Sequence, residues 1–351
     1  MRPLIGNAFA AALVLAGTAT AQPAPPPAGR VRPAPAISQT VLIRRLAKTL
    51  DSLSAIGEFS GVVVVSKNGA PVFQRPYGMA DRETLRRNTL TTAFNLGSIN
   101  KVFTSIAIHQ LAAQGKLDLD STLARAWPAY PNQEIARRVT VRQLLNHRSG
   151  LGGNIFAAPS GGSRGDLRRL PDFLPLFVNE PLQFEPGSRQ AYSNAGYVVL
   201  GLLVERLSGV SYYDYVKKNI YTPAGMTRTG HFAVDSLPPN TAVGYTRRDR
   251  SAPATIAVAP NTSTLPGRGS SAGGGYSTAQ DLVAFLQALR NKRISAGPPA
   301  GLGIAGGAPG INAMVEGDMP GGYDLIVLAN LDPPAAERIA RTVRAWLGAG
   351  D

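Results

Sequence analysis

Residues Asn95–Gly115 read NLGSINKVFTSIAIHQLAAQG, and the rest of the chain is best interpreted outward from this stretch. Apolar residues recur at helical spacing between Gly97 and Gly115, which predicts a helix of about four turns. Because apolar side chains occupy most of its faces, we expect the helix to be buried. Lys101 nevertheless lies in its first turn, three residues after Ser98 and on the same face.

Burial and the positive end of a helix both lower the pKa of a lysine. A neutral amine within reach of a hydroxyl can act as a general base beside a nucleophile, so Ser98 and Lys101 are candidates for these two roles. The same spacing also arises from a serine at a helix start and a lysine that reaches solvent, and the pair alone does not separate the two interpretations.

The composition excludes several classes of chemistry. The chain has 351 residues, a net charge of +14, no cysteine and three histidines. Without cysteine there is neither a thiol nucleophile nor a disulfide. His109, His147 and His231 form no paired-ligand pattern, so we expect neither a metal nor a cofactor. The basic residues are scattered, which favours no nucleic-acid partner and leaves only weak contact with anionic envelope polymers.

The first residues resemble a secretory signal. Ala8–Ala16 is an apolar stretch, and Ala19–Ala21 has the small-x-small pattern of a cleavage site, so residues 1–21 are predicted to be a signal peptide. The apolar stretch is too short to span a membrane, so we expect no stable membrane insertion. Residues 22–37 are a Pro/Ala-rich linker without a cysteine for lipid attachment. We therefore expect a periplasmic or secreted protein with its domain in residues 38–351.

Strand patterns occur at both ends of this domain. Asn68-Gly69 separates two apolar stretches and is a strong hairpin signal, and Pro320-Gly321-Gly322 separates Ile311–Glu316 from Tyr323–Asn330. Amphipathic helices are predicted outside these hairpins, at Gln39–Ile56 and Pro334–Leu347.

Between the hairpins helical patterns dominate. They include Asn194–Gly209, Tyr212–Tyr221 and Ser277–Arg290, the last opened by a predicted capping box of Ser277 and Gln280. This order predicts an α+β fold, in which one antiparallel sheet built from both chain ends is flanked by the terminal helices and carries an inserted, mostly helical lobe. The sheet part is predicted at about 38–95 and 301–351 and the lobe at about 96–300, with a ligand cleft between them.

Tyr192 and Asn194 stand directly before the helix predicted at Asn194–Gly209. Two side chains so spaced at the start of an element can face one cavity. A tyrosine near an ammonium group is stabilised as phenolate and could accept a serine proton. The alternative is that Tyr192 packs in the core and that Asn194 or Ser193 caps the helix.

Three short patterns match well-known motifs without the required context. Residues 161–165 and 269–273 match the G-x-S-x-G nucleophile elbow, but no apolar strand precedes either. Residues 301–306 match the dinucleotide fingerprint but follow a Pro/Gly loop and open no helix, so no nucleotide cofactor is expected.

Taken together, the order of these stretches resembles the serine β-lactamase and penicillin-recognising enzyme superfamily, most of all its class C β-lactamase and esterase branch. The resemblance covers roughly Phe59–Leu331 and implies a β-lactamase/transpeptidase-like fold. The stretches that carry it are FSGVVVVSKNGAPVFQRPYGMADRET, FNLGSINKVFTSIAIHQLAAQGKLDLD, VTVRQLLNHRSGL, FEPGSRQAYSNAGYVVLGLLVERLSG, PAGM, SAGGGYSTAQDL and GGAPGI.

The resemblance implies a role for each candidate residue. Ser98 would be the acylated nucleophile, Lys101 the amine that activates it, and Tyr192 the proton shuttle. Asn194 would hydrogen-bond Lys101 and the substrate. The backbone N–H groups of Ser98 and Gly307 would form the oxyanion hole.

One position departs from the family pattern. Members carry Lys-Thr-Gly or His-x-Gly on the strand across the cleft, whereas here Ile304 takes the place of the Lys or His. Ile304 cannot orient an acidic substrate, so recognition of a β-lactam carboxylate is less expected than ester cleavage. Arg268 is a candidate for the missing cation. In the resembling families the segment that contains His147 is structural, and His109 is expected to be a core or boundary residue.

We therefore predict an exported serine hydrolase that cleaves an ester, amide or lactam in a small acyl substrate through an acyl-enzyme. One alternative is a β-lactamase or D-alanyl-D-amino-acid peptidase. Another is a non-catalytic descendant of the fold that binds a ligand in the cleft without cleaving it.

Overall fold

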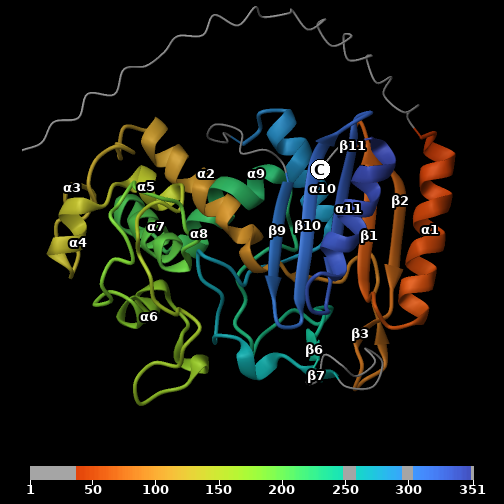
Figure 1. Cartoon of the computed structure of the whole chain (residues 1–351), viewed down its shortest axis with the longest axis horizontal. Helices are drawn as coiled ribbons and strands as arrows, with labels where there is room; N and C mark the ends of the chain where they lie inside the picture. The colour runs from red at the N-terminus through yellow and green to blue at the C-terminus, as the bar shows by residue number, and fades with distance from the viewer. Residues whose placement is uncertain (1–36, 248–257, 295–302, 349–351) are drawn as a thin grey trace, which may run out of the picture. The chain divides into compact units, whose positions relative to one another are not determined.

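The computed structural model in Figure 1 describes residues 37–247, 258–294 and 303–348. These residues belong to one unit that runs from Ala36 to Asp351. The predicted signal peptide, nearly all of the predicted linker and the start of the 301–306 pattern lie outside the described residues.

The main sheet joins strands from both ends of the domain. It is antiparallel, and its five strands lie in the order β2-β1-β11-β10-β9. The strands are β1 (Gly61–Lys67), β2 (Ala70–Tyr77), β9 (Gly303–Ala308), β10 (Ile311–Met319) and β11 (Tyr323–Ala329). The predicted α+β fold is thereby confirmed.

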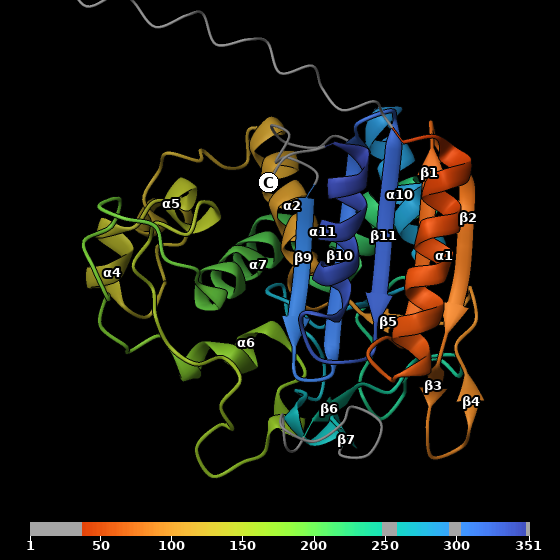
Figure 2. The same cartoon turned by 45° about the vertical axis from the view of Figure 1, so that its right-hand side comes forward.

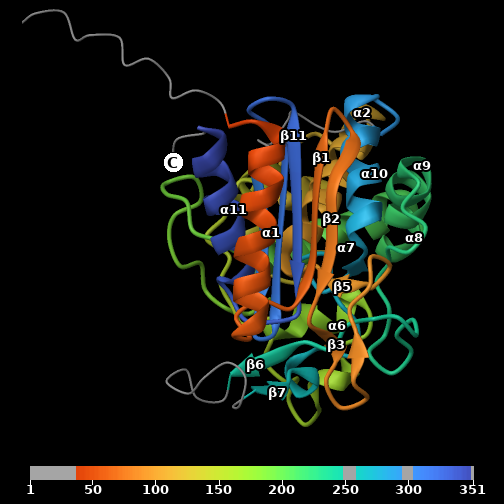
Figure 3. The same cartoon turned by 90° about the vertical axis from the view of Figure 1, so that its right-hand side faces the viewer.

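Both faces of this sheet are covered, which explains the run of four valines in β1. Val63 and Val65 point into a core beneath the terminal helices α1 (Gln39–Ala55) and α11 (Ala335–Leu347). Val62 and Val64 point into the larger core shared with the helical region. A strand buried on both faces shows a continuous apolar run rather than alternation. Figure 3 shows α1 and α11 side by side over one face of the sheet.

The turn between β1 and β2 has the geometry that its sequence predicts. Asn68 and Gly69 have φ angles of 50° and 82°. A two-residue hairpin of this type needs positive φ at both positions, which asparagine and glycine adopt most readily.

Much of the inserted region lies beside the β9 edge of the sheet, as Figures 1 and 2 show, whereas its helix α10 (Ala279–Arg290) packs against β1 and β11 on the face opposite α1 and α11. Its helices are α2 (Asn100–Ala113), α3 (Leu123–Ala126), α4 (Gln133–Arg138), α5 (Val141–Leu145), α6 (Leu170–Phe173), α7 (Asn194–Ser208), α8 (Tyr212–Val216), α9 (Thr222–Ala224) and α10 (Ala279–Arg290). Short 3-10 turns occupy Gly97–Ile99, Arg164–Asp166, Leu174–Leu176 and Thr262–Thr264, and a π turn occupies Lys217–Tyr221. Two-stranded ribbons pair β3 (Met79–Asp81) with β4 (Arg86–Arg87), β5 (Phe94–Asn95) with β8 (Tyr276–Ser277), and β6 (Tyr245–Arg247) with β7 (Val258–Pro260).

The predicted capping box of α10 is wrong. The N-cap is Thr278, whose hydroxyl accepts the Asp281 N–H at 3.2 Å. Ser277 instead ends β8, where it pairs with Phe94 and its hydroxyl lies 2.7 Å from Thr229 Oγ1. The tertiary pairing of β8 therefore moves the helix start one residue along the chain.

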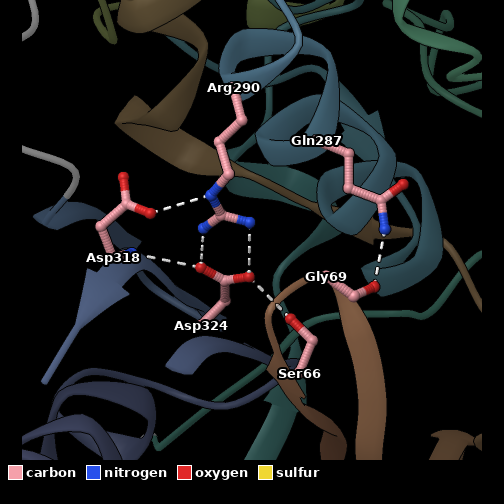
Figure 4. Close-up of polar contacts among 6 residues, drawn as sticks. All are labelled: Ser66, Gly69, Gln287, Arg290, Asp318 and Asp324. Carbon is pink, nitrogen blue, oxygen red and sulfur yellow. Dashed lines mark hydrogen bonds and ion pairs between the residues drawn. The ribbon is translucent and has the colours of Figure 1, made fainter. Parts of the chain in front are cut away.

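Polar contacts bind helix α10 to the end of the sheet that carries the β1–β2 turn (Figure 4). Arg290 pairs with both carboxylate oxygens of the buried Asp324, which also accepts a hydrogen bond from Ser66 at 2.7 Å. Gln287 donates to the Gly69 carbonyl at 2.7 Å. Helix α10 thus contacts β11 and the β1–β2 turn directly, and it is connected to β1 through Asp324.

Among the described helices, none combines the length and the apolar character needed to cross a lipid bilayer.

Candidate active site

Ser98 lies in the 3-10 turn that leads into α2, and Lys101 is in the first turn of that helix. Lys101 Nζ is hydrogen-bonded to Ser98 Oγ at 3.1 Å, and it donates to Asn194 Oδ1 at 2.8 Å and to the carbonyl of Ala272. The predicted Ser98–Lys101 pair is therefore in direct contact, and Asn194 joins it from α7. Ala272 is a partner that the sequence reasoning missed.

The protonation of Lys101 follows from its surroundings. Its side chain is buried, and among the described residues its partners are a hydroxyl, an amide oxygen and a carbonyl, with no carboxylate. Burial therefore lowers its pKa from 10.5 to about 7. A large fraction of the amine is neutral near pH 7, as a general base requires.

Tyr192 reaches the same serine from the other side. Its hydroxyl donates to Ser98 Oγ at 2.6 Å, and its ring centroid lies 4.7 Å from Lys101 Nζ. Partial burial raises the pKa of Tyr192, while the hydrogen bond to Ser98 opposes that shift. In this state of the site Tyr192 donates a hydrogen bond to the serine, and its role as a phenolate that accepts the serine proton stays a prediction.

Asn194 is free to reach Lys101 because its neighbour caps the helix. Ser193 is the N-cap of α7, and its hydroxyl accepts the Gly196 N–H at 3.0 Å. The sequence left Asn194 and Ser193 open as the residue that caps the helix, and in the structure the cap is Ser193.

His147 lies against the tyrosine and not against the serine. Its ring centroid is 4.6 Å from that of Tyr192 and 5.0 Å from that of Tyr197, and its Nδ1 accepts the Ser193 N–H at 3.2 Å. Burial, reinforced by the charge of Lys101, lowers the pKa of His147 to about 4, so it is neutral at pH 7. His109 is further along α2, where its Nδ1 donates to the Ser105 carbonyl at 2.7 Å.

The backbone of β9 passes directly against the turn that holds Ser98. A Cβ on Gly306 would lie 2.0 Å from the Leu96 carbonyl oxygen and 3.0 Å from the Ser98 nitrogen, and a Cβ on Gly97 would lie 3.1 Å from the Gly307 nitrogen. Only glycine permits this approach at Gly306.

The hairpin register sets the direction of the Gly307 N–H. Pro309 and Gly310 form the two-residue turn between β9 and β10, and the flanking Ala308 and Ile311 are paired across the ladder. The pair that closes such a turn exchanges hydrogen bonds, and the next pair in an antiparallel ladder does not. Gly307, opposite Asn312, therefore directs its N–H away from β10 and toward the free edge of the sheet.

These groups lie in a cleft of about 420 Å³. Its lining includes Ser98, Tyr192, Asn194 and Gly307, together with parts of the 161–165 and 269–273 stretches. The two false nucleophile elbows are therefore wall segments of the cleft. Arg164, from the first of them, also lines it, and no sequence signal singled this residue out.

Neither Ile304 nor Arg268 is among the described residues that line the cleft. Ile304 packs against the larger core. Arg268 donates to the His231 carbonyl at 2.7 Å, and its guanidinium lies 3.7 Å from the centroid of the Tyr213 ring. The interpretation of Arg268 as a replacement cation in the cleft is therefore wrong.

A metal ion would need several ligands in one place. Within residues 37–247, 258–294 and 303–348, no three His, Asp or Glu side chains gather in a way that could hold one.

Comparison with known proteins identifies the family. The family described as Beta-lactamase matches residues 46–327. PbpX, a proposed penicillin-binding protein of Bacillus subtilis (strain 168), is 32% identical over 252 residues, which are 72% of this chain and 60% of that protein. The chain spans between 37 and 60% of the length of the first curated relatives that it matches.

Solved structures agree with this result. A penicillin-binding protein from Bacillus halodurans aligns with a TM-score of 0.72 and 30% identity, over 84% of this chain and 99% of that one. The D-amino acid amidase from Ochrobactrum anthropi SV3 aligns with a TM-score of 0.71 and 24% identity, over 87% of this chain and 99% of that one, which shows the fold alone. The resemblance drawn from the sequence is confirmed: the chain belongs to the Beta-lactamase family, within the serine β-lactamase and transpeptidase superfamily.

Proposed function

We propose that the protein is a serine hydrolase that forms an acyl-enzyme on Ser98 and cleaves an ester, amide or lactam bond. The observation that carries the proposal is the hydrogen bond between Ser98 Oγ and the amine of Lys101, which is buried away from carboxylates within the described part of the chain. A structural lysine would be expected to keep its charge and a carboxylate partner.

In the first half of the reaction, neutral Lys101 accepts the proton of Ser98 as Oγ attacks the substrate carbonyl. The N–H groups of Ser98 and Gly307 would stabilise the negative charge on the tetrahedral oxygen, a contribution worth about 3 kcal/mol per donor. The neutral hydroxyl of Tyr192 gives its proton to the leaving group, and the proton held by Lys101 replaces it. The bond to the leaving group breaks, and the acyl group remains on Ser98.

In the second half, water attacks the acyl-enzyme. Tyr192 and Lys101 take the proton of that water, and Ser98 Oγ is protonated as the acid leaves. Asn194 holds Lys101 in place through the 2.8 Å hydrogen bond and would contact the amide or ester of the substrate.

The substrate is proposed to be a small acyl compound. Relatives with this fold include penicillin-binding proteins and an amidase, and their names support acyl chemistry in this fold. They also support a β-lactamase or D-alanyl-D-amino-acid peptidase as the second candidate. Ile304 favours an ester over these two, because β9 offers no cation to the carboxylate that a β-lactam or a D-alanyl peptide carries. We also propose export to the periplasm or the medium, on the basis of residues 1–21.

The test is hydrolysis of 4-nitrophenyl acetate and labelling by a fluorophosphonate probe, each with wild type and Ser98→Ala. We expect a burst of 4-nitrophenol followed by turnover, and a label on the wild type alone. A wild type that neither labels nor hydrolyses would instead support a cleft that binds without cutting. Penicillin and a D-alanyl-D-alanine peptide, assayed beside the ester, separate the two candidate substrate classes.

A further inference from the structure

Beyond the reacting groups, the cleft is apolar and carries a single charge. Arg164 is the one charged side chain among the described residues that line it, and no aspartate or glutamate of the described chain does. The apolar part of the lining includes Ile155, Phe156, Phe173, Phe232, Val234 and Leu265. Arg164 is half-buried beside this wall, where a cation gains more from a negatively charged partner than it does in bulk water.

Arg164 is held firmly in the wall. Its carbonyl accepts the Gly267 N–H at 2.9 Å, and a Cβ on Gly267 would lie 2.0 Å from the Gly165 carbonyl oxygen, so the two segments are in backbone contact. The guanidinium donates from Nε to the Phe156 carbonyl at 2.6 Å and from Nη1 to the Ser263 carbonyl at 3.4 Å. The side chain is therefore oriented before any ligand binds.

These contacts leave one edge of the guanidinium available. Nη2 and the second hydrogen of Nη1 make no hydrogen bond within the described residues, and no described carboxylate lies within salt-bridge distance of Arg164. Other arginines of the chain do have such partners: Arg168 pairs with Asp235 at 2.5 Å, and Arg169 pairs with Asp172 at 3.2 Å. The free edge of a guanidinium has the geometry that binds a carboxylate through two parallel hydrogen bonds.

We propose that Arg164 binds a carboxylate carried by the substrate at the end of an apolar substituent. The substrate class is then an ester or amide whose acyl part is apolar near the carbonyl and anionic at its far end. This inference rests on the proposed function, since it assumes that the cleft beside Ser98 is the substrate site. It also places the cation for an acidic substrate on the loop that contains residues 161–165, and not on β9, where Ile304 stands.

The first experiment compares mono-4-nitrophenyl esters of adipic, pimelic and suberic acid with the same esters bearing a terminal amide in place of the carboxylate. We expect wild type to cleave at least one carboxylate ester with a kcat/KM about tenfold above that of its amide partner, since a charged hydrogen-bonded pair is worth this much or more. Arg164→Gln should bring the two values together, and Arg164→Lys should keep part of the difference. Arg168→Gln, which removes a neighbouring charge outside the cleft lining, should preserve it. Equal kcat/KM values for each wild-type pair would overturn the inference.

A second measurement does not depend on turnover. Titration calorimetry with the Ser98→Ala protein should show tighter binding of the carboxylate ester, and the Ser98→Ala/Arg164→Gln protein should show equal binding of both. If the preference appears in binding while wild type cleaves neither ester, the hydrolase proposal fails and the anion site stands. If the Ser98→Ala protein binds both esters equally, Arg164 is not a carboxylate site.

Discussion

Replacing Asn194 by aspartate changes the charge beside Lys101 while nearly keeping the shape of the site. Asn194 Oδ1 accepts a hydrogen bond from Lys101 Nζ at 2.8 Å, so Asn194→Asp places a carboxylate against the amine. Opposite charges about 4 Å apart attract by about 4 kcal/mol at an effective dielectric constant of about 20. That energy corresponds to an upward shift of about three pKa units.

The direction of the effect on activity follows from the role of the amine. In the proposed reaction Lys101 must be neutral to accept the proton of Ser98, and in the wild type its pKa of about 7 leaves about half of it neutral at pH 7. A pKa of about 10 leaves roughly one molecule in a thousand neutral at that pH. We therefore expect Asn194→Asp to lower kcat/KM at pH 7 about 500-fold and to regain activity as the pH rises toward 10.

The assay is the dependence of kcat/KM on pH between 5.5 and 10.5 with 4-nitrophenyl acetate, with the Ser98→Ala rate subtracted as background. Asn194→Ala is the control, because it removes the hydrogen bond without adding a charge. It should lower the rate at every pH without moving the acidic limb, along which activity rises with pH, to higher pH. If the limb of Asn194→Asp stays near pH 7, the protonation of Lys101 does not govern the reaction and the reasoning is refuted.

Three further changes test other parts of the molecule. Gly306→Ala should lower kcat/KM at least 100-fold, because its Cβ would displace β9 from the Ser98 turn, whereas Gly303→Ala, which meets no described atom within 4 Å, should retain activity. Asp324→Asn should lower the free energy of unfolding by about 3 kcal/mol in urea, because it removes the buried partner of an ion pair. The exposed Glu134→Gln control should cost less than about 1 kcal/mol, and equal losses would show that the Asp324 pair adds no stability of its own. Lys101→Met should abolish activity yet stabilise the fold most at pH 7 and below. Between pH 7 and 10, Lys101 of the unfolded wild type holds a proton that Lys101 of the folded protein lacks. The free energy of unfolding of the wild type should therefore rise by about 1.4 kcal/mol per pH unit relative to that of the variant. Parallel curves of unfolding free energy against pH would contradict this.

Local geometry can be predicted from the sequence where neighbouring residues in the chain determine it. The spacing of Ser98 and Lys101 places both on one helix face, and Asn68-Gly69 forms its turn without help from distant residues. Features that depend on distant segments were not readable. The start of α10 at Thr278 depends on the pairing of Ser277 with Phe94.

The protonation states of the site residues and the identity of the residues that line the cleft could also not be predicted without the folded structure. The contact of Tyr192 with Ser98, and the burial that raises the pKa of Tyr192, join segments 94 residues apart in the chain. Arg164 enters the wall because Gly267, about a hundred residues later, holds its backbone there. Arg168 and Arg169 are close to Arg164 in the sequence, and no pattern in the sequence separates the three arginines.

The joining of the two chain ends in one sheet also controls when the site can exist during synthesis. Ser66 and Asp324 are hydrogen-bonded although 258 residues separate them, and the Gly307 N–H meets the Ser98 turn only when β9 is in place. A growing chain therefore carries Ser98 and Lys101 about two hundred residues before it carries β9, whose Gly307 N–H we propose as part of the oxyanion hole. Contacts this distant also make folding slow. The acyl transfer that we propose at Ser98 is therefore expected only after β9 has been synthesised and has paired with β10.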